Sequence, residues 1–133
     1  MATLRDLSQL TGIGIVADHD PEFDIPVLDG LQRQGDVLVL PGSAVATTAV
    51  PTAGTPVVRG ESSGNTHGIY AVDGPVYCDN DLADELRVAT VTVPNGSVAY
   101  LCHPEHGFMG IGPGNYEIRR QREWARGIRT VAD

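Results

Sequence analysis

The chain has 133 residues, enough for one domain with an ordinary core, and 41% of them are hydrophobic. Its 9 basic residues face 17 acidic ones, so the formal net charge is −8. This charge opposes nonspecific nucleic-acid binding, which needs cationic groups to displace counterions from phosphates. No apolar run reaches the roughly 20 residues that a membrane span needs.

The N-terminal sequence lacks a basic segment followed by an apolar one, so we expect no signal peptide. The two cysteines, Cys78 and Cys102, are too few for a disulfide framework. Without export we expect both thiols to be reduced, and a Cys78–Cys102 pair is the alternative in an oxidising location.

The first predicted element is a short helix over residues 3–10. Thr3 can cap it, Asp6 lies near the positive end of its dipole, and leucines recur at every third residue. Gly12 ends the pattern. We treat residues 1–12 as an N-terminal helix or arm of a single domain that covers residues 1–133.

Acidic residues alternate over residues 18–24 in a way that is similar to a calcium loop. Phe23 stands where an EF-hand loop needs glycine, and the twelfth position is Asp29 instead of glutamate. We predict an exposed acidic loop, with calcium binding as the alternative.

Residues 33–124 have the pattern of a β core. Short runs rich in Val, Thr and Ile recur about every 8 to 12 residues, with turn residues between them. We predict an all-β fold, a small antiparallel barrel or sandwich of about seven or eight strands with one short N-terminal helix. The predicted strands cover residues 36–40, 57–59, 66–72, 76–78, 86–93, 97–102, 108–111 and 115–123.

Two turns in this core carry further expectations. Pro94-Asn95-Gly96 tolerates positive φ, and it predicts a hairpin between residues 86–93 and 97–102. The glycine-rich residues 60–68 are explained by a β-turn between two strands. The alternative is a phosphate cradle that binds a nucleotide with Arg59, although the Gly-Lys-Ser/Thr of a P-loop is absent.

The run Cys102-His103-Pro104-Glu105-His106-Gly107 is the densest group of chemically capable side chains. Imidazole, thiolate and carboxylate groups are ligands for zinc or iron. Adjacent strand residues point to opposite faces, so Cys102 and His103 converge only if Pro104 bends the chain. The alternative is that His103 and His106 hydrogen-bond to the backbone at a strand end. The candidate ligands for a metal or small molecule are His67, His103, His106, Glu61 and Cys102.

Cys102 beside a histidine also suggests a thiol nucleophile. A nucleophile and its base must meet in space, whereas neighbouring strand residues point apart, and no Asn or Asp partner is evident. We therefore predict no catalytic residue and no resident cofactor, with zinc or iron as the alternative.

Charge is distributed unevenly along the chain. Residues 115–133 carry 5 arginines and 3 acidic residues, a balance of +2, and the rest carries 4 arginines and 14 acidic residues, a balance of −10. We expect the basic end, including a tail over residues 125–133, to dock on an acidic face of a second copy or of a larger assembly. A solvated tail is the alternative. The predicted interaction residues are Arg119, Arg120, Arg122, Arg126 and Arg129.

A resemblance covers roughly residues 33–124 and rests on four ordered blocks. These are Gln34-Gly35-Asp36-Val37, then Arg59-Gly60-Glu61 with Gly64 and His67, then His103-Pro104-Glu105-His106-Gly107, then Gly114-Asn115-Tyr116-Glu117-Ile118 with Arg120-Gln121-Arg122-Glu123. The set resembles a family of small uncharacterised β-rich proteins of bacteria and actinobacterial phages. The family often has a second histidine where this chain has Asn65. The resemblance implies a location in the cytoplasm of a bacterial host or in a virion, and the use of arginine without lysine agrees with such a source.

Two functions follow as hypotheses. The favoured one is a noncatalytic β module, a phage structural or accessory protein, that self-associates or docks on a larger assembly. The alternative is a cupin-like metal-dependent enzyme or a small-ligand or nucleotide binder that uses His67, His103 and His106. The histidine blocks are loosely similar to the two cupin motifs, but the His-x-His followed by Glu of a cupin is incomplete here.

Overall fold

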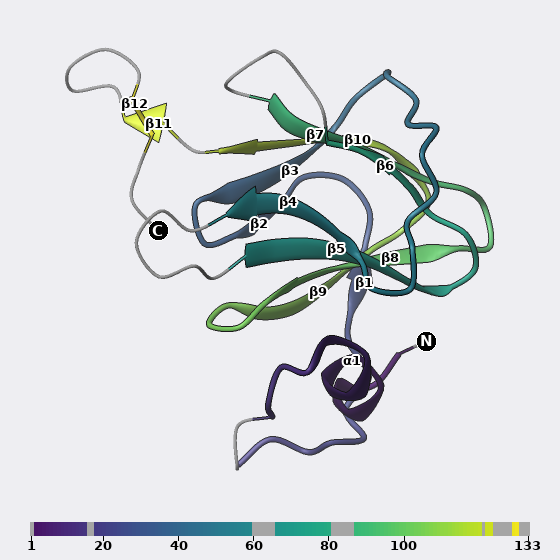
Figure 1. The fold of residues 1–133 in the computed structure, drawn as a ribbon, viewed down its shortest axis with the longest axis vertical. Helices are drawn as coiled ribbons and strands as arrows, with labels where there is room; N and C mark the ends of the chain where they lie inside the picture. Colours follow the sequence, from purple (N-terminus) through teal and green to yellow (C-terminus); the bar gives the residue numbers. More distant parts are fainter. Residues whose placement is uncertain are drawn as a thin grey trace.

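The computed structural model describes residues 2–15, 18–59, 66–80, 87–120, 122–123 and 129–130. Within these ranges the chain forms one helix, α1 (Leu4–Thr11), and twelve short strands (Figure 1). The predicted all-β fold with a short N-terminal helix is confirmed. The strands outnumber the predicted seven or eight, because several contain only two or three residues.

Ten strands form two five-stranded sheets. The first sheet has the order β1 (Val27–Leu28), β9 (Gly107–Ile111), β8 (Val98–His103), β5 (Thr66–Asp73) and β4 (Thr55–Arg59). The second has the order β2 (Gln32–Gln34), β3 (Val37–Pro41), β10 (Gly114–Arg120), β7 (Arg87–Val93) and β6 (Tyr77–Asp79). β11 (Arg122–Glu123) and β12 (Arg129–Thr130) pair with each other, and all pairs are antiparallel except β1 with β9.

The two sheets pack face to face around one apolar core. Val39 and Ile118 from the second sheet are buried in the same cluster as Ile69 and Leu101 from the first. Neither sheet closes on itself within the described residues. The sandwich prediction is therefore confirmed and the barrel alternative is wrong.

The predicted hairpin between residues 86–93 and 97–102 is also wrong. β7 pairs with β6 and β10, whereas β8 pairs with β5 and β9, so the two strands lie in different sheets. The turn itself is present, since the Ser97 N–H donates to the Pro94 carbonyl at 3.0 Å and Gly96 has a φ of 86°. A local turn signal fixes where the chain reverses, but not which strands become neighbours.

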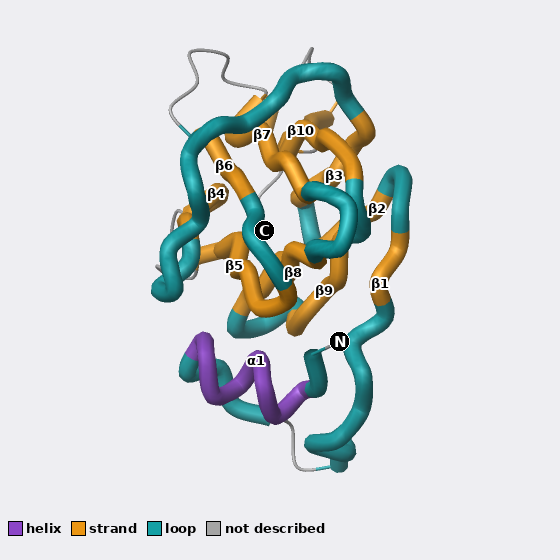
Figure 2. Tube along the Cα trace, turned by 90° about the vertical axis from the view of Figure 1, so that its right-hand side faces the viewer, coloured by secondary structure: helices purple, strands orange, loops and turns teal. Residues whose placement is uncertain are grey.

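The N-terminal helix covers the outer face of the first sheet (Figure 2). Thr3 caps it as predicted, because its side chain accepts from the Asp6 N–H while the Asp6 carboxylate accepts from the Thr3 N–H. Leu7 is buried against Tyr100 and Cys102 of β8 in a second apolar cluster. Within the described residues, no helix has the length and hydrophobicity of a membrane span.

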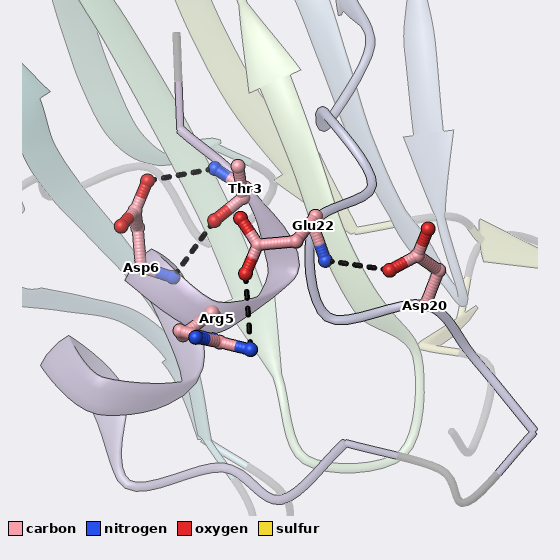
Figure 3. A network of polar contacts seen from close by, with 5 residues as sticks. All are labelled: Thr3, Arg5, Asp6, Asp20 and Glu22. Carbon is pink, nitrogen blue, oxygen red and sulfur yellow. Dashed lines mark hydrogen bonds and ion pairs between the residues drawn. The ribbon is translucent and has the colours of Figure 1, made fainter.

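The acidic segment over residues 18–24 is an exposed loop, as expected, that folds back on the helix. The Arg5 guanidinium pairs with Glu22 at 3.0 Å, and the Glu22 N–H donates to the Asp20 carboxylate at 2.9 Å (Figure 3). Within the described residues, the acidic side chains of this loop form no cluster suited to hold a metal ion. The calcium alternative therefore has no support from the geometry.

Candidate metal centre

Three of the four histidines meet at one end of the first sheet. His67 belongs to β5, His103 is the last residue of β8, and His106 lies in the turn between β8 and β9. Each offers one ring nitrogen, and these three nitrogens lie within 4.8 Å of one another. His67 and His103 are buried, whereas His106 is exposed.

Strand register explains why residues 36 positions apart meet. Gly68 pairs with Cys102, and one further step in the same antiparallel register brings His67 opposite His103. Across the other edge of β8, His103 pairs with Gly107, so the turn between them is only residues 104–106. Gly107 has a φ of 84°, which suits glycine, and the tight turn returns His106 to the other two rings.

The three imidazole ring centroids form a triangle. They are 4.1 Å apart for His67 and His103, 4.5 Å for His103 and His106, and 5.7 Å for His67 and His106. Two nitrogens on one tetrahedral zinc ion lie about 3.3 Å apart, given Zn–N bonds of about 2.0 Å. The nitrogens therefore approach one another by about 1.5 Å at most when they share an ion.

His103 makes the backbone hydrogen bonds expected of a histidine at a strand end. Its Nδ1 accepts from the N–H groups of Glu105 at 3.1 Å and His106 at 3.2 Å. An accepting Nδ1 carries no proton, so a neutral ring has its proton on Nε2. These two bonds fix the orientation of the ring and of the turn.

Cys102 does not join the histidines. Its side chain lies on the opposite face of β8, buried among Leu7, Ile25 and Tyr100. This burial raises the pKa of the Cys102 thiol, which disfavours the thiolate needed of a ligand or nucleophile. Cys78 is buried in the core between the sheets, and both thiols are free, so the Cys78–Cys102 pair is not formed.

Some predicted residues lie outside the described part of the chain or are described by backbone alone. Glu61 and Arg126 lie outside it, and the backbones of Arg122 and Arg129 belong to β11 and β12. β4 and β5 pair on either side of residues 60–65, with Arg59 opposite Thr66, as expected for two strands joined by this segment.

The two remaining predicted interaction residues belong to β10. Arg119 donates to the Glu117 carboxylate at 2.8 and 3.0 Å, so its charge is engaged within the chain. Arg120 is the last residue of that strand and is partly buried. Within the described residues, the Arg119 side chain therefore already forms an ion pair with Glu117.

Sequence reasoning assigned no role to Gln34, which anchors the histidine turn. This side chain is buried on β2, and its Nε2 donates to the carbonyls of Leu101 at 3.1 Å and Gly107 at 3.3 Å. Gln32, two residues earlier on β2, also donates through its Nε2 to a carbonyl of β9, that of Gly110 at 3.1 Å. The two glutamines thus tie β8 and β9, the strands on either side of the turn that contains His106, to the second sheet. The segment Gln32-Arg33-Gln34 is polar at every position, so the sequence carried no local signal for this role.

A pocket of about 550 Å³ lies beside the histidines. One side is formed by the N-terminal arm and the acidic loop, and the other by the turn after β8. His106 lines this pocket and also belongs to the histidine cluster. Of the three histidines, His106 is therefore the one that the pocket reaches.

A family model described as a domain of unknown function (DUF8820) matches residues 33–121. The chain belongs to this family. The match includes the three histidines and Gln34, and it leaves α1 and the acidic loop outside. The expected membership in a β-rich family is therefore supported over almost the same residues. No curated protein and no solved structure matches the chain.

Proposed function

We propose that this protein binds a divalent transition-metal ion through His67, His103 and His106. The convergence of three imidazole nitrogens within 4.8 Å carries the proposal. Imidazole suits zinc, copper, iron and nickel, and zinc accepts a set of three histidines readily. Three protein ligands leave the fourth position of a tetrahedral ion open to water or to a small ligand.

Metal binding requires a change at His103. Its Nδ1 already accepts two backbone hydrogen bonds. Coordination through Nδ1 uses that lone pair, and coordination through Nε2 requires the proton to move to Nδ1 or the ring to turn over, so both hydrogen bonds are lost. Losing them costs about 0.5–1.5 kcal/mol each. The metal–nitrogen bonds of the three histidines have to offset this cost.

His106 is the ligand through which an ion enters and leaves. It is exposed, whereas the other two histidines are buried. An ion can therefore bind His106 first and reach the buried nitrogens as the turn tightens. His106 is also the ligand whose loss least disturbs folding.

The metal content of protein purified without an affinity tag tests this proposal. We expect one zinc ion per chain after zinc addition, and we expect His106→Ala to weaken binding by at least about 100-fold, since loss of an outer-shell partner alone costs roughly 10–100-fold. His19→Ala is the matched control, because His19 is the one histidine outside the cluster. Failure of the native protein to take up zinc or iron contradicts the proposal.

We also propose that the chain self-associates or docks on a larger assembly, such as a phage particle. The charge split supports this, with −10 over residues 1–114 and +2 over residues 115–133. Arg119 is engaged by Glu117, so the docking charge comes from the arginines beyond it. Light scattering after size exclusion tests self-association. A lower mass after deletion of residues 125–133 supports it, and a strict monomer contradicts it.

A further inference from the structure

We propose a second binding site, distinct from the metal ligands: the pocket between the N-terminal arm and the turn after β8 takes a small organic cation with an apolar body, such as a primary amine carrying a phenyl group. This proposal rests on the pocket and its lining. It does not depend on the metal-binding function.

The pocket is built between two parts of the chain that are far apart in sequence. Leu4 of α1 forms one wall together with residues from 13–15 and 18–26, and residues 104–108 form the other. Both walls are attached to the same sheet. The Ala2 N–H donates to the Tyr100 hydroxyl at 3.0 Å, and the Gly110 N–H of β9 donates to the Pro26 carbonyl at 3.1 Å. Its volume, about 550 Å³, lies within the roughly 300–1,000 Å³ typical of small-molecule sites.

The lining combines an apolar surface with carboxylates. Apolar side chains come from both walls, and they are Leu4, Ile13, Ile15, Phe23, Ile25 and Phe108. Three carboxylates join them, those of Asp18, Asp20 and Glu105. The described lining residues also include two histidines, His19 and His106, but no arginine, and the chain has no lysine. An apolar body fits the apolar surface, and the negative potential selects a cation over an anion.

The polar network of the arm keeps a carboxylate at the pocket. The Asp20 side chain is positioned by the Glu22 N–H, as Figure 3 shows. The nearby Arg5 guanidinium pairs with Glu22, which does not line the pocket. Arg5 therefore leaves the charge of Asp20 available to a ligand.

The site adjoins the histidines through one residue. His106 lines the pocket, whereas His67 and His103 are buried and are not among its lining residues. A bound cation therefore lies beside His106. This arrangement allows both sites to be tested on the same protein.

The experiment compares two probes of similar shape and opposite charge, 2-phenylethylamine and 3-phenylpropionate, by calorimetric titration of the full chain in chelator. We expect the amine to bind at least about tenfold more tightly than the carboxylate, and the preference to shrink at high salt. The double variant Asp18→Asn with Asp20→Asn should weaken amine binding about tenfold. Asparagine at position 20 keeps the oxygen that accepts from Glu22, so the loop keeps its shape.

Two controls make the outcome specific. Asp29→Asn removes an exposed carboxylate that does not line the pocket, and it should leave amine binding unchanged. Phe23→Ala changes a lining side chain that is 54% exposed, and it should weaken both probes. No binding of the amine, or equal binding by the native chain and the double variant, overturns the proposal. Because the titration is run in chelator, its result is independent of zinc uptake.

Discussion

The two faces of β8 contribute to different clusters, although their residues alternate along a single strand. On the inner face Leu101 enters the sandwich core and His103 joins the histidines. On the outer face Tyr100 and Cys102 are buried beneath the N-terminal helix. Because side chains alternate with a period of two, the adjacent pair Cys102-His103 is divided between an apolar cluster and a polar one. Because they are adjacent on a strand, the Cys102 thiol and the His103 imidazole point to opposite faces and do not form one site.

The largest expected effect is on the inner face. Leu101→Ala should lower the free energy of unfolding by about 2–5 kcal/mol, because it leaves a cavity in a core that both sheets share. Leu7→Ala removes the same atoms from the outer cluster, and it should loosen the helix while the sandwich stays folded. Urea denaturation measures the first effect, and proteolysis within residues 13–26 measures the second. A cooperative loss of the sandwich in Leu7→Ala contradicts this distinction.

Each of the two apolar clusters contains a buried thiol, Cys78 of β6 in the sandwich core and Cys102 of β8 beneath the helix, and this makes stability fall at high pH. Burial raises the pKa of Cys78 from its ordinary 9.0 to about 12, and burial also raises the pKa of Cys102. Above pH 9 the unfolded chain loses these protons while the folded chain keeps them. Stability is therefore lost as the pH rises from 9 to 12, by about 1.4 kcal/mol per pH unit for Cys78 alone.

Because the chain has no lysine, no lysine ammonium group titrates alongside the thiols at high pH. Denaturation midpoints at pH 8, 8.5 and 9 measure the onset of this loss while the tyrosines, whose ordinary pKa is about 10, keep their protons. The double variant Cys78→Ala with Cys102→Ala should show little change between pH 8 and 9. An equally steep loss in that variant contradicts the assignment to the thiols.

The smallest expected effect is a change in hydrogen exchange in the turn between β8 and β9 when zinc binds. Zinc should release the N–H groups of Glu105 and His106 from the Nδ1 of His103, since coordination removes that acceptor. Hydrogen exchange at these two amides should then become about five- to tenfold faster, which corresponds to about 1 kcal/mol per bond. The amide of Leu101, which belongs to the sheet, is the internal control. Unchanged exchange at both turn amides after zinc uptake contradicts the role given to Nδ1.

Much of the fold was predictable from local patterns, and the partners of its strands were not. Thr3 and Asp6 identified the helix start, and alternating residues identified β7 and β10. β1 and β2 have only two and three residues, so they are too short to produce a pattern. The Asn-Gly turn before β8 suggested a hairpin, but β7 and β8 each pair with two other strands.

The candidate site was also predictable only in part. Residue type and spacing identified His67, His103 and His106 as a group, and the register of β5 with β8 brings them together. Because adjacent strand residues point to opposite faces, the sequence alone already argued that Cys102 and His103 do not bind the same metal ion. Gln34 and the pocket depend on contacts between segments distant in sequence, and a single chain without aligned relatives carries no local signal for such contacts.

Zinc titration of two single variants tests most directly the claim that the histidines, and not the neighbouring thiol, form the metal centre. His67→Ala removes a ligand from β5, and Cys102→Ala removes the thiol beside His103 on the other face of β8. We predict that Cys102→Ala binds one zinc ion with native affinity and that His67→Ala loses at least about 100-fold. Native affinity in His67→Ala, or loss of binding in Cys102→Ala, would contradict the account.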